Sequence, residues 1–342
     1  MGGVYMLSTN QSILTNKKHI IVLITVLSLV IAAAGYFYYK NQESSIRQQK
    51  YNELKAIADL KVNQIEEWIK ERKSDVIGVV QLPFFVRAIN QWLNDSGNVQ
   101  LKQDIIEHLR LIQKENGYEN IFLTTANGQL LLSVKTELEE FHTLTKQIIT
   151  ETSKKREIVF TDFYFCQKEN KIHYDIIAPI IYNENKTIAI LLFRRNPNDY
   201  LYPLINKWPT LSKSAETLLL RIEKDSVLFL NELLHRKNSA LKLKIPFTRT
   251  ELPAVQAALG HTGIFEGIDY RGVEVLSDIR KIPATNWFMV AKVDKSEIYS
   301  DLYLTAIVIS GFTIFLIIIC VFLSGFLLSC KAGLARLRTI SG

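Results

Sequence analysis

The sequence predicts an α+β protein in which two antiparallel-sheet modules lie beside a long N-terminal helix, flanked by two transmembrane helices. Three observations predict this fold. Two long runs contain no charged residue, a segment after the first run has helical periodicity, and the order strand, strand, helix, strand, strand, strand then occurs twice. A chain of 342 residues has room for two or three compact units.

The two uncharged runs, residues 20–39 and 302–330, are predicted to cross a membrane. They contain 20 and 29 residues, and about 20 apolar residues suffice for a helix to span a bilayer. The first run is longer than the apolar part of a signal peptide, about 7–15 residues, and it ends in "YFYYK". Aromatic residues followed by a cation are typical of an uncleaved helix that reaches the membrane interface. The alternative, a buried helix of a soluble protein, is disfavoured by the length of the second run.

Basic residues flank both runs on the sides that face the chain ends. They are Lys17, Lys18, Lys331, Arg336 and Arg338. Short basic flanks of transmembrane helices stay in the cytoplasm. We therefore expect a multi-pass protein in which residues 1–19 and 331–342 are cytoplasmic and residues 40–301 are extracytoplasmic.

The composition excludes several function classes. The net charge is +7, but the basic residues alternate with acidic ones, as in "KSDVIG" and "RIEKDS". Such a mixed surface is typical of a solvated face, so we expect no nucleic-acid partner. Cys166 is the only cysteine outside the two apolar runs, which leaves no partner for a disulfide there.

Sequence motifs for catalysis and for metal or cofactor binding are absent. The chain contains no GxGxxG, Walker loop, HExxH or GxSxG pattern, and its six histidines are scattered without metal-ligand spacing. We therefore predict no catalytic residue, no metal site and no cofactor. Only residues 331–342 follow the second run, too few for a catalytic domain, so the chain itself is not expected to be an enzyme.

Residues 40–117 are predicted to form a helical stalk and a second helix. Apolar residues at helical spacing make one stripe, and no glycine or proline interrupts residues 40–76. The stripe consists of Leu54, Ala58, Val62, Ile65, Ile69 and Val76. Pro83 should end the first helix. "LPFFVRAINQWL" suits a packed helix-and-loop junction, and a second amphipathic helix over Val99–Glu115 should be capped by Gly117.

Residues 118–200 are predicted to form the first sheet module. The pair Asn127-Gly128 between two apolar runs favours a hairpin with a type I′ turn, which requires positive φ at both residues. A helix is expected over Glu137–Lys154. Three strands should follow, over Ile158–Phe165, Lys171–Ile181 and Thr187–Arg194.

Residues 201–301 repeat this order of elements without a visible sequence repeat. "AETLLLRIEKDSVLFLNEL" favours a hairpin, "RTELPAVQAALG" a short helix, and "TGIFEGIDY", "VEVLSDIRKI" and "NWFMVAKVD" three strands. In the turn between the first two of these strands, Asp269, Arg271 and Gly272 are expected to set the geometry, with the charges in solvent. Trp287 is expected to be a core residue or a membrane-facing anchor.

The two modules resemble a double Cache (dCache) domain, the PAS-like extracellular sensor of bacterial transmembrane receptors. "FTDFYFCQKENKIHYDIIAPI" carries the resemblance in the membrane-distal module, and "GIDYRGVEVLSDIRKIPATNWFMVAKVDKSEIY" carries it in the membrane-proximal one. "SKSAETLLLRIEKDSVLFLNELLH" is similar to Cache regions that precede PAS, histidine-kinase or diguanylate-cyclase domains. The resemblance covers about residues 40–301. It implies a receptor in the bacterial plasma (inner) membrane that works as a homodimer.

The resemblance also implies a small-molecule pocket in the distal module. Its polar candidates are Asp162, Tyr164, Tyr174, Asp175, Arg194 and Arg195. Arginine can bind a carboxylate through two hydrogen bonds and aspartate can accept one from an ammonium group, so the ligand would be an amino acid, an organic acid or an amine. Strand alternation places Asp162, Tyr164 and Cys166 on one face with Phe160 and lets only one of the two arginines point inward. The complete amino-acid-binding pattern of tyrosine, arginine, tryptophan, tyrosine and aspartate is absent.

These features favour a transmembrane receptor input module that binds a ligand outside and signals through the second span. Three alternatives remain open: the N-terminal part of a sensor histidine kinase of a two-component system or of a diguanylate cyclase, the input region of a chemoreceptor, and a membrane-anchored scaffold or partner subunit without a ligand. The apolar stripe of the long helix could contact a second copy or pack against its own modules.

Overall fold

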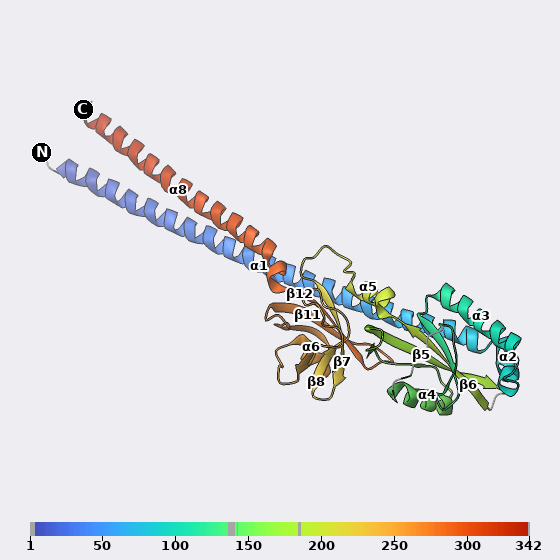
Figure 1. Cartoon of the computed structure of the whole chain (residues 1–342). Helices are drawn as coiled ribbons and strands as arrows, with labels where there is room; N and C mark the ends of the chain where they lie inside the picture. The colour runs from blue at the N-terminus through green and yellow to red at the C-terminus, as the bar shows by residue number, and fades with distance from the viewer. Residues whose placement is uncertain (1–3, 136–140, 142, 184–185, 341–342) are drawn as a thin grey trace. The chain divides into compact units, whose positions relative to one another are not determined.

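The computed structural model describes residues 4–135, 141, 143–183 and 186–340 (Figure 1). It divides into two compact units. Met1–Glu53 and Asp294–Gly342 form one, here called the helical unit, and Leu54–Val293 form the other, here called the sensor unit. Helix α1, Val4–Val80, contributes residues to both.

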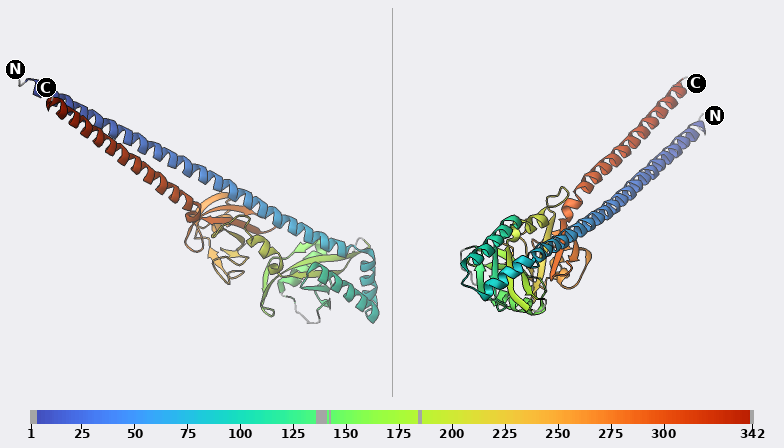
Figure 2. Two further views of the ribbon diagram at one scale, coloured as in Figure 1. Left: turned by 90° about the horizontal axis from the view of Figure 1, so that it is seen from above. Right: turned by 90° about the vertical axis from the view of Figure 1, so that its right-hand side faces the viewer.

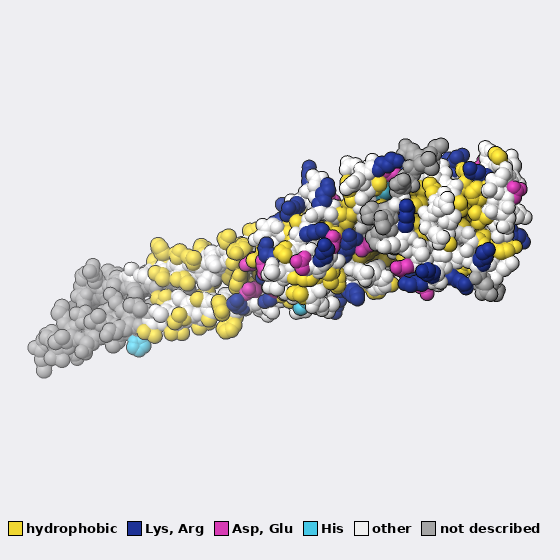
Figure 3. Space-filling model, turned by 60° about the horizontal axis from the view of Figure 1, so that its bottom comes forward, with side chains coloured by type: hydrophobic (Ala, Val, Ile, Leu, Met, Phe, Trp, Pro, Cys, Tyr) yellow, Lys and Arg dark blue, Asp and Glu magenta, His cyan; other side chains and the backbone are white. Residues whose placement is uncertain are grey.

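The helical unit consists of the first part of α1 together with α7, Lys295–Ile298, and α8, Ser300–Ile340. Helices α1 and α8 are both long and apolar enough to cross a membrane, α8 over Leu302–Ile319. Where side chains of these segments are described, exposed hydrophobic ones dominate, while charged side chains are spread over the sensor unit (Figure 3). A Cβ on Gly35 of α1 would lie 3.4 Å from Oγ1 of Thr313 on α8, so the two helices approach each other closely there. Two apolar helices are thus present, as the sequence predicts.

In the sensor unit, the predicted apolar stripe of α1 is confirmed and is buried within the chain. Leu54, Ala58, Ile65 and Val76 are at most 3 % exposed, because the two sheets cover this face of the helix (Figure 2). These four residues therefore pack against their own modules, whereas Val62 of the stripe is only partly buried. Pro83 acts as expected, since α1 ends at Val80 before it.

Two further helices follow α1. Helix α2, Pro83–Asn94, starts with a proline in its first turn and buries one apolar face that includes Trp92. Helix α3, Val99–Asn116, begins where the side chain of Asn98 accepts a hydrogen bond from the backbone N–H of Leu101. It ends at Gly117, whose φ of 67° makes it the predicted C-terminal cap.

The first sheet is antiparallel, with the strand order β2-β1-β6-β5-β3, and β4 pairs with β5. Helix α4, Thr143–Lys155, covers one face and packs Ile149 against Phe122 and Ile177. Helices α1 and α3 lie on the other side of the sheet (Figure 1). The strands are β1 Asn120–Thr124, β2 Leu130–Ser133, β3 Val159–Phe160, β4 Tyr164–Cys166, β5 Lys171–Tyr182 and β6 Lys186–Arg195.

The single strand predicted over Ile158–Phe165 is interrupted by a β-bulge. Phe160 pairs with Ile176, whereas Tyr164 pairs with His173, so three residues of one strand oppose two of β5. The extra residue reverses the alternation. Phe160 therefore faces α1, while Tyr164 faces the opposite side of the sheet, and the prediction that they share a face is wrong.

The Asn127-Gly128 hairpin exists, but its turn differs from the prediction. Only Gly128 has a positive φ, of 80°, and Asn127 does not. The backbone N–H of Gly128 donates to the carbonyl of Thr125, and the N–H of Thr125 donates to the carbonyl of Gln129. This is a type I turn followed by a glycine bulge rather than a type I′ turn. The start of the helix predicted over Glu137–Lys154 lies outside the described residues.

The second sheet is also antiparallel, with the order β10-β11-β12-β7-β8-β9. The predicted hairpin, helix and three strands are all present, and β9 is an additional short edge strand. The core on one face packs Phe229 and Val290 against Val255 of helix α6, Pro253–Ala258. The turn η1, Pro197–Asp199, and helix α5, Leu201–Asn206, connect the two sheets. The strands are β7 Glu216–Glu223, β8 Ser226–Phe229, β9 Lys244–Pro246, β10 Gly263–Ile268, β11 Glu274–Lys281 and β12 Trp287–Asp294.

The aspartate of the β10–β11 turn is buried, contrary to the prediction, whereas Arg271 is partly exposed. Gly272 has a φ of 84°, as a turn glycine should, but the Asp269 side chain is only 1 % exposed and its carboxylate lies 3.0 Å from Nζ of Lys292. Lys292 is fully buried in β12 and also contacts Glu216 at 2.9 Å. A buried ammonium group requires counter-charges, which the turn aspartate and Glu216 supply.

Candidate functional site

A buried ion pair occupies the face of the first sheet on which α4 packs. Asp175 of β5 and Arg194 of β6 are register partners, so their side chains project together. Nε of Arg194 lies 3.0 Å from Oδ1 of Asp175, and the hydroxyl of Tyr164 donates to Oδ2 at 2.7 Å. Asp175 is 0 % exposed and Arg194 is 5 % exposed. The structure thus brings three of the predicted site residues together, through the bulge that turns Tyr164 to this side.

The surroundings keep Tyr164 in its neutral form. Burial raises the pKa of this phenol far above its ordinary value, and the adjacent Asp175 carboxylate raises it further. The guanidinium of Arg194 also lies over the ring of Phe122, at 4.8 Å from its centroid. With all these groups engaged, the Asp175–Arg194 pair serves to hold Tyr164 in place.

Two other predicted site residues, Tyr174 and Arg195, lie on the α1 face of the same sheet. Tyr174 packs edge-on against Trp68 at 5.4 Å. Arg195 lies 4.7 Å above the ring of Tyr118 and donates to the carbonyl of Asn116. Burial raises the pKa of Tyr118 to about 12. The adjacent arginines thus point to opposite faces, as alternation predicts, but both are buried because helices cover both faces.

Asp162 lies in the bulge and joins the two sheets. Its Oδ1 is 3.0 Å from Nη1 of Arg221 on β7, and it accepts a hydrogen bond from Nε1 of Trp287 on β12 at 3.0 Å. The rings of Phe163 and Trp287 stack at 4.7 Å with an interplanar angle of 16°. Trp287 is therefore a core residue, one of the two roles expected from the sequence.

A cavity of about 300 Å³ lies next to Asp162, between α4, the bulge and the second sheet. Here it is called the candidate pocket. Asp162 and Tyr164 line it, whereas the other four predicted site residues do not. The lining residues are Thr145, Ile148, Thr161, Asp162, Phe163, Tyr164, Phe165, Arg221, Glu223, Leu228, Leu241 and Lys244.

Sequence reasoning missed the contribution of the second sheet to this pocket. Arg221 and Glu223 are alternate residues at the end of the strand "ETLLLRIE", after its three leucines. Nζ of Lys244 lies 2.8 Å from Glu223, and the combined effect of Lys244 and Arg221 holds the pKa of the Glu223 carboxyl below its ordinary value. Two charged positions on one face of an apolar strand were the signal available in the sequence. Their proximity to Asp162 depends on how the two sheets pack.

A second, wider groove of about 640 Å³ lies on the other side of Asp162. Lys73 of α1 and Lys281 at the end of β11 supply its cationic groups, and the loop before Trp287 forms one wall. The lining residues are Ile69, Lys73, Ile158, Val159, Phe160, Thr161, Asp162, Lys281, Pro283, Ala284, Thr285, Asn286 and Trp287.

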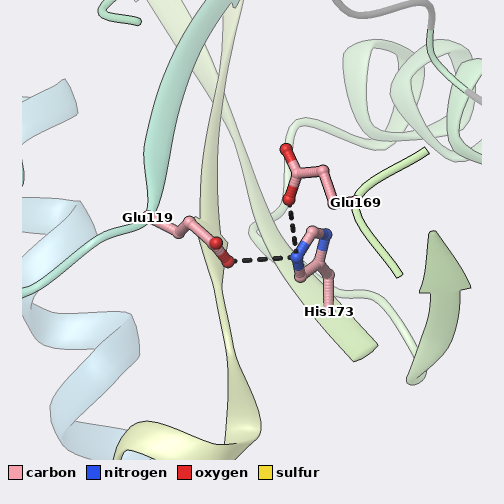
Figure 4. A group of neighbouring side chains, drawn as sticks. All are labelled: Glu119, Glu169 and His173. Atoms are coloured by element: carbon pink, nitrogen blue, oxygen red, sulfur yellow. Dashed lines mark ion pairs between the residues drawn. The ribbon is translucent and has the colours of Figure 1, made fainter. Parts of the chain in front are cut away.

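A third polar group lies at the end of the first sheet, where Glu119, Glu169 and His173 converge (Figure 4). Nε2 of His173 is 3.0 Å from Glu119 and 3.1 Å from Glu169. His173 is 0 % exposed, and burial lowers the pKa of its imidazole more than the neighbouring Glu119 carboxylate raises it. The ring is therefore neutral near pH 7.

Solved structures with a similar fold are sensory domains of bacterial chemoreceptors. The ligand-binding domain of Campylobacter jejuni Tlp3 in complex with L-norvaline matches with a TM-score of 0.55 and 16 % identity, over 74 % of this chain and 94 % of that domain. The sensory domain of Tlp3 with isoleucine bound matches with a TM-score of 0.54 and 16 % identity, over 75 % and 96 %. No family model and no curated protein matches the chain.

The sensor unit, with its long N-terminal helix and two antiparallel sheets, matches these structures in fold. At 16 % identity the similarity establishes the fold, and the ligand site of this chain has to be argued from its own residues. The sensor unit has the fold of a double Cache sensory domain.

Proposed function

We propose that this chain is the input part of a transmembrane receptor, which binds a small zwitterion such as an amino acid in the candidate pocket. The observation that carries this proposal is the pairing of opposite charges along the pocket wall, within a double Cache fold. Arg221 faces Asp162 at 3.0 Å, and Lys244 faces Glu223 at 2.8 Å. The chain would not itself be an enzyme.

The chemistry of the pocket wall suits such a ligand. The guanidinium of Arg221 can bind a carboxylate through two hydrogen bonds, and the carboxylate of Asp162 can accept from an ammonium group. Ile148 and Leu228 supply apolar surface for a side chain. A volume of about 300 Å³ is at the lower end of ligand pockets, roughly 300–1,000 Å³. An organic acid could pair only with the arginine, and an amine only with the aspartate.

The comparisons support the amino-acid class, because the Tlp3 domains named above were solved with L-norvaline and with isoleucine. They also favour the chemoreceptor input region among the possible parents. A sensor histidine kinase or a diguanylate cyclase would use the same input module. In each case both chain ends would be in the cytoplasm of a bacterium, the sensor unit would lie outside, and the receptor would act as a homodimer in the plasma membrane.

Signalling would follow from the ligand's preference for one packing of the two sheets. The candidate pocket and the Asp162–Trp287 hydrogen bond both connect the first sheet to the second. Strand β12 starts at Trp287 and leads directly into α7 and then α8. A ligand shifts such an equilibrium only by its difference in affinity for the two states.

A thermal-shift screen of the full chain in nanodiscs tests this proposal. All four tryptophans, Trp68, Trp92, Trp208 and Trp287, lie in the sensor unit, so tryptophan fluorescence reports on its unfolding alone. We expect amino acids to raise the midpoint temperature saturably. A membrane-anchored scaffold without a ligand would show no shift with amino acids, organic acids or amines, and that result would overturn the proposal.

The variant Arg221→Gln identifies the pocket. It should raise at least tenfold the amino-acid concentration that gives half of the maximal thermal shift, because the carboxylate of the ligand would lose a charge-assisted pair of hydrogen bonds. Arg249→Gln is the matched control, since Arg249 is half-exposed and pairs with Glu251 outside the pocket. Equal responses of both variants would place the binding site elsewhere in the sensor unit.

A further inference from the structure

We propose that Glu119, Glu169 and His173 form a binding site for a first-row divalent metal ion, with Zn²⁺ as the best-suited ion. The three residues come from separate parts of the first sheet. Glu119 directly precedes β1, Glu169 lies in the β4–β5 turn, and His173 is in β5 (Figure 4). The proposal is independent of the ligand in the candidate pocket.

The spacing of the ligand atoms fits a metal ion. One oxygen of each glutamate and a ring nitrogen of the histidine all lie within 4.8 Å of one another. The two contacts to Nε2 measure 3.0 and 3.1 Å. Zinc binds nitrogen and oxygen at about 2.0–2.2 Å, so neighbouring ligand atoms of a tetrahedral site are roughly 3.3–3.5 Å apart. The two contacts to His173 are therefore a few tenths of an ångström shorter than in an occupied site, and the two glutamate oxygens, within 4.8 Å of each other, would have to adopt the same spacing.

Hydrogen bonding does not account for the arrangement. Both carboxylate oxygens are close to the same ring nitrogen, which can carry only one hydrogen. Neither Nε2 nor Nδ1 of His173 has a hydrogen-bond partner within the described part of the chain, although the ring is fully buried. Both oxygens lie at hydrogen-bond distance from the nitrogen without forming a hydrogen bond to it, an arrangement that suits a shared cation. A buried polar group without a partner is unfavourable, and a metal ion would satisfy it.

Charge and access are also consistent with a cation. Two carboxylates face the ring, and Lys171 contacts the other oxygen of Glu119 at 2.7 Å. Arg194, a cation that also acts on the ring, is paired with Asp175. The side chains of Glu119 and Glu169 are 10 % and 19 % exposed, which gives an ion a route from solvent to the buried ring.

The donor set selects the class of metal. One imidazole nitrogen with two carboxylates suits Zn²⁺ and its first-row neighbours, whereas Ca²⁺ and Mg²⁺ prefer oxygen ligands alone. Three protein ligands leave the fourth position of a tetrahedral ion for water or another small ligand. A bound ion would fasten the β4–β5 turn to the start of β1.

Zinc titration of the full chain tests the site. The affinity tag is removed, the chain is placed in nanodiscs of zwitterionic lipid and stripped with a chelator, and binding is measured by calorimetry and by elemental analysis after gel filtration. We expect one Zn²⁺ per chain, with no displacement by excess Mg²⁺. Absence of saturable zinc binding would overturn the proposal.

Two isosteric variants, Glu119→Gln and Glu169→Gln, locate the ion. Each should weaken zinc binding at least about tenfold, because even groups outside the ligand set change metal affinity by about 10- to 100-fold. Glu151→Gln is the control, since Glu151 is 67 % exposed on α4 and pairs with Lys155. Unchanged binding by both test variants would contradict the site.

A measurement on the parent chain keeps the test decisive if a variant fails to fold. Titration with Co²⁺ should give the visible absorption of a low-coordinate nitrogen–oxygen site, and Zn²⁺ should abolish it. Absorption no stronger than that of aqueous Co²⁺ would contradict the proposal without any variant.

Discussion

The replacement Asp175→Asn should strongly destabilise the sensor unit. Asparagine has the size of aspartate but no charge, so the substitution leaves the Arg194 guanidinium buried without its counter-ion. The Asp175 carboxylate is 0 % exposed, and it accepts from both Arg194 and Tyr164, at 3.0 and 2.7 Å. The packing of the sheet would otherwise be preserved.

The magnitude follows from the burial of both partners. Removing one partner of a buried ion pair costs about 3–5 kcal/mol, because the remaining charge is uncompensated. For a unit of this size each kcal/mol lowers the midpoint temperature by about 2–4 °C, so Asp175→Asn should lower it by roughly 6–20 °C. The exposed Asp104, which accepts a hydrogen bond from Gln100 on α3, provides the control. Asp104→Asn should cost less than about 0.5 kcal/mol.

Thermal unfolding of the full chain in nanodiscs, followed by tryptophan fluorescence, measures both variants. Adding Arg194→Met to Asp175→Asn should recover part of the lost stability, because a neutral pair of similar volume removes the buried charge. A decrease of less than 3 °C in the midpoint temperature of Asp175→Asn would refute this reasoning. So would a double variant whose stability is lower than that of Asp175→Asn by as much as Arg194→Met alone lowers the stability of the parent chain.

Three further predictions use the same unfolding assay. Trp287→Phe keeps the ring stack but removes the N–H donor to the half-buried Asp162. It should therefore lower the free energy of unfolding by about 1–2 kcal/mol, and an unchanged stability would show that this hydrogen bond does not join the sheets. Gly267→Ala would place a Cβ 2.4 Å from the carbonyl oxygen of Glu251, so it should cost about 1–3 kcal/mol, and a neutral effect would contradict the close approach. Burial raises the pKa of Asp278 to about 6, above its ordinary value near 3.9, so its ionisation weakens the folded state as the pH rises from about 4 to about 6. The free energy of unfolding of Asp278→Asn minus that of the parent chain should therefore be about 1–3 kcal/mol higher at pH 7.5 than at pH 4. A difference that does not change with pH would contradict this prediction.

The sequence predicted the order of elements because periodicity and turn residues are local signals. Pro83 and Gly117 act as the helix boundaries that their backbone chemistry requires. The double Cache resemblance rested on the same order of strands and helices, and the structural comparisons bear it out. The two candidate spans followed from hydropathy alone.

The candidate pocket was less predictable, because it depends on contacts between distant residues. One extra residue near Asp162 creates a bulge, which reverses the side-chain alternation on which the face assignments relied. Nothing local in the sequence reports the pairing register of β3 and β4 with β5. The pocket also takes Arg221 and Lys244 from the second sheet, and the sequence does not state how two sheets pack.

Buried charges were the other reason why the structure differs from the sequence-based predictions. Lys292 and Asp269 are 23 residues apart and look like ordinary solvated charges in the sequence, yet they form a buried pair. His173 and Glu119 are 54 residues apart and show no metal-ligand spacing, but sheet pairing brings them within 3.0 Å. Such pairs become visible only when strand neighbours are known.

The central claim is that the sensor unit binds its ligand between Asp162 and the second sheet. Hydrogen exchange of the full chain in nanodiscs, with and without the amino acid that gives the largest thermal shift, tests this claim most directly. We predict that the ligand slows exchange in the segments 161–165 and 221–228, which contain most of the residues that line the candidate pocket. Saturable binding with unchanged exchange in both segments would contradict this location of the site.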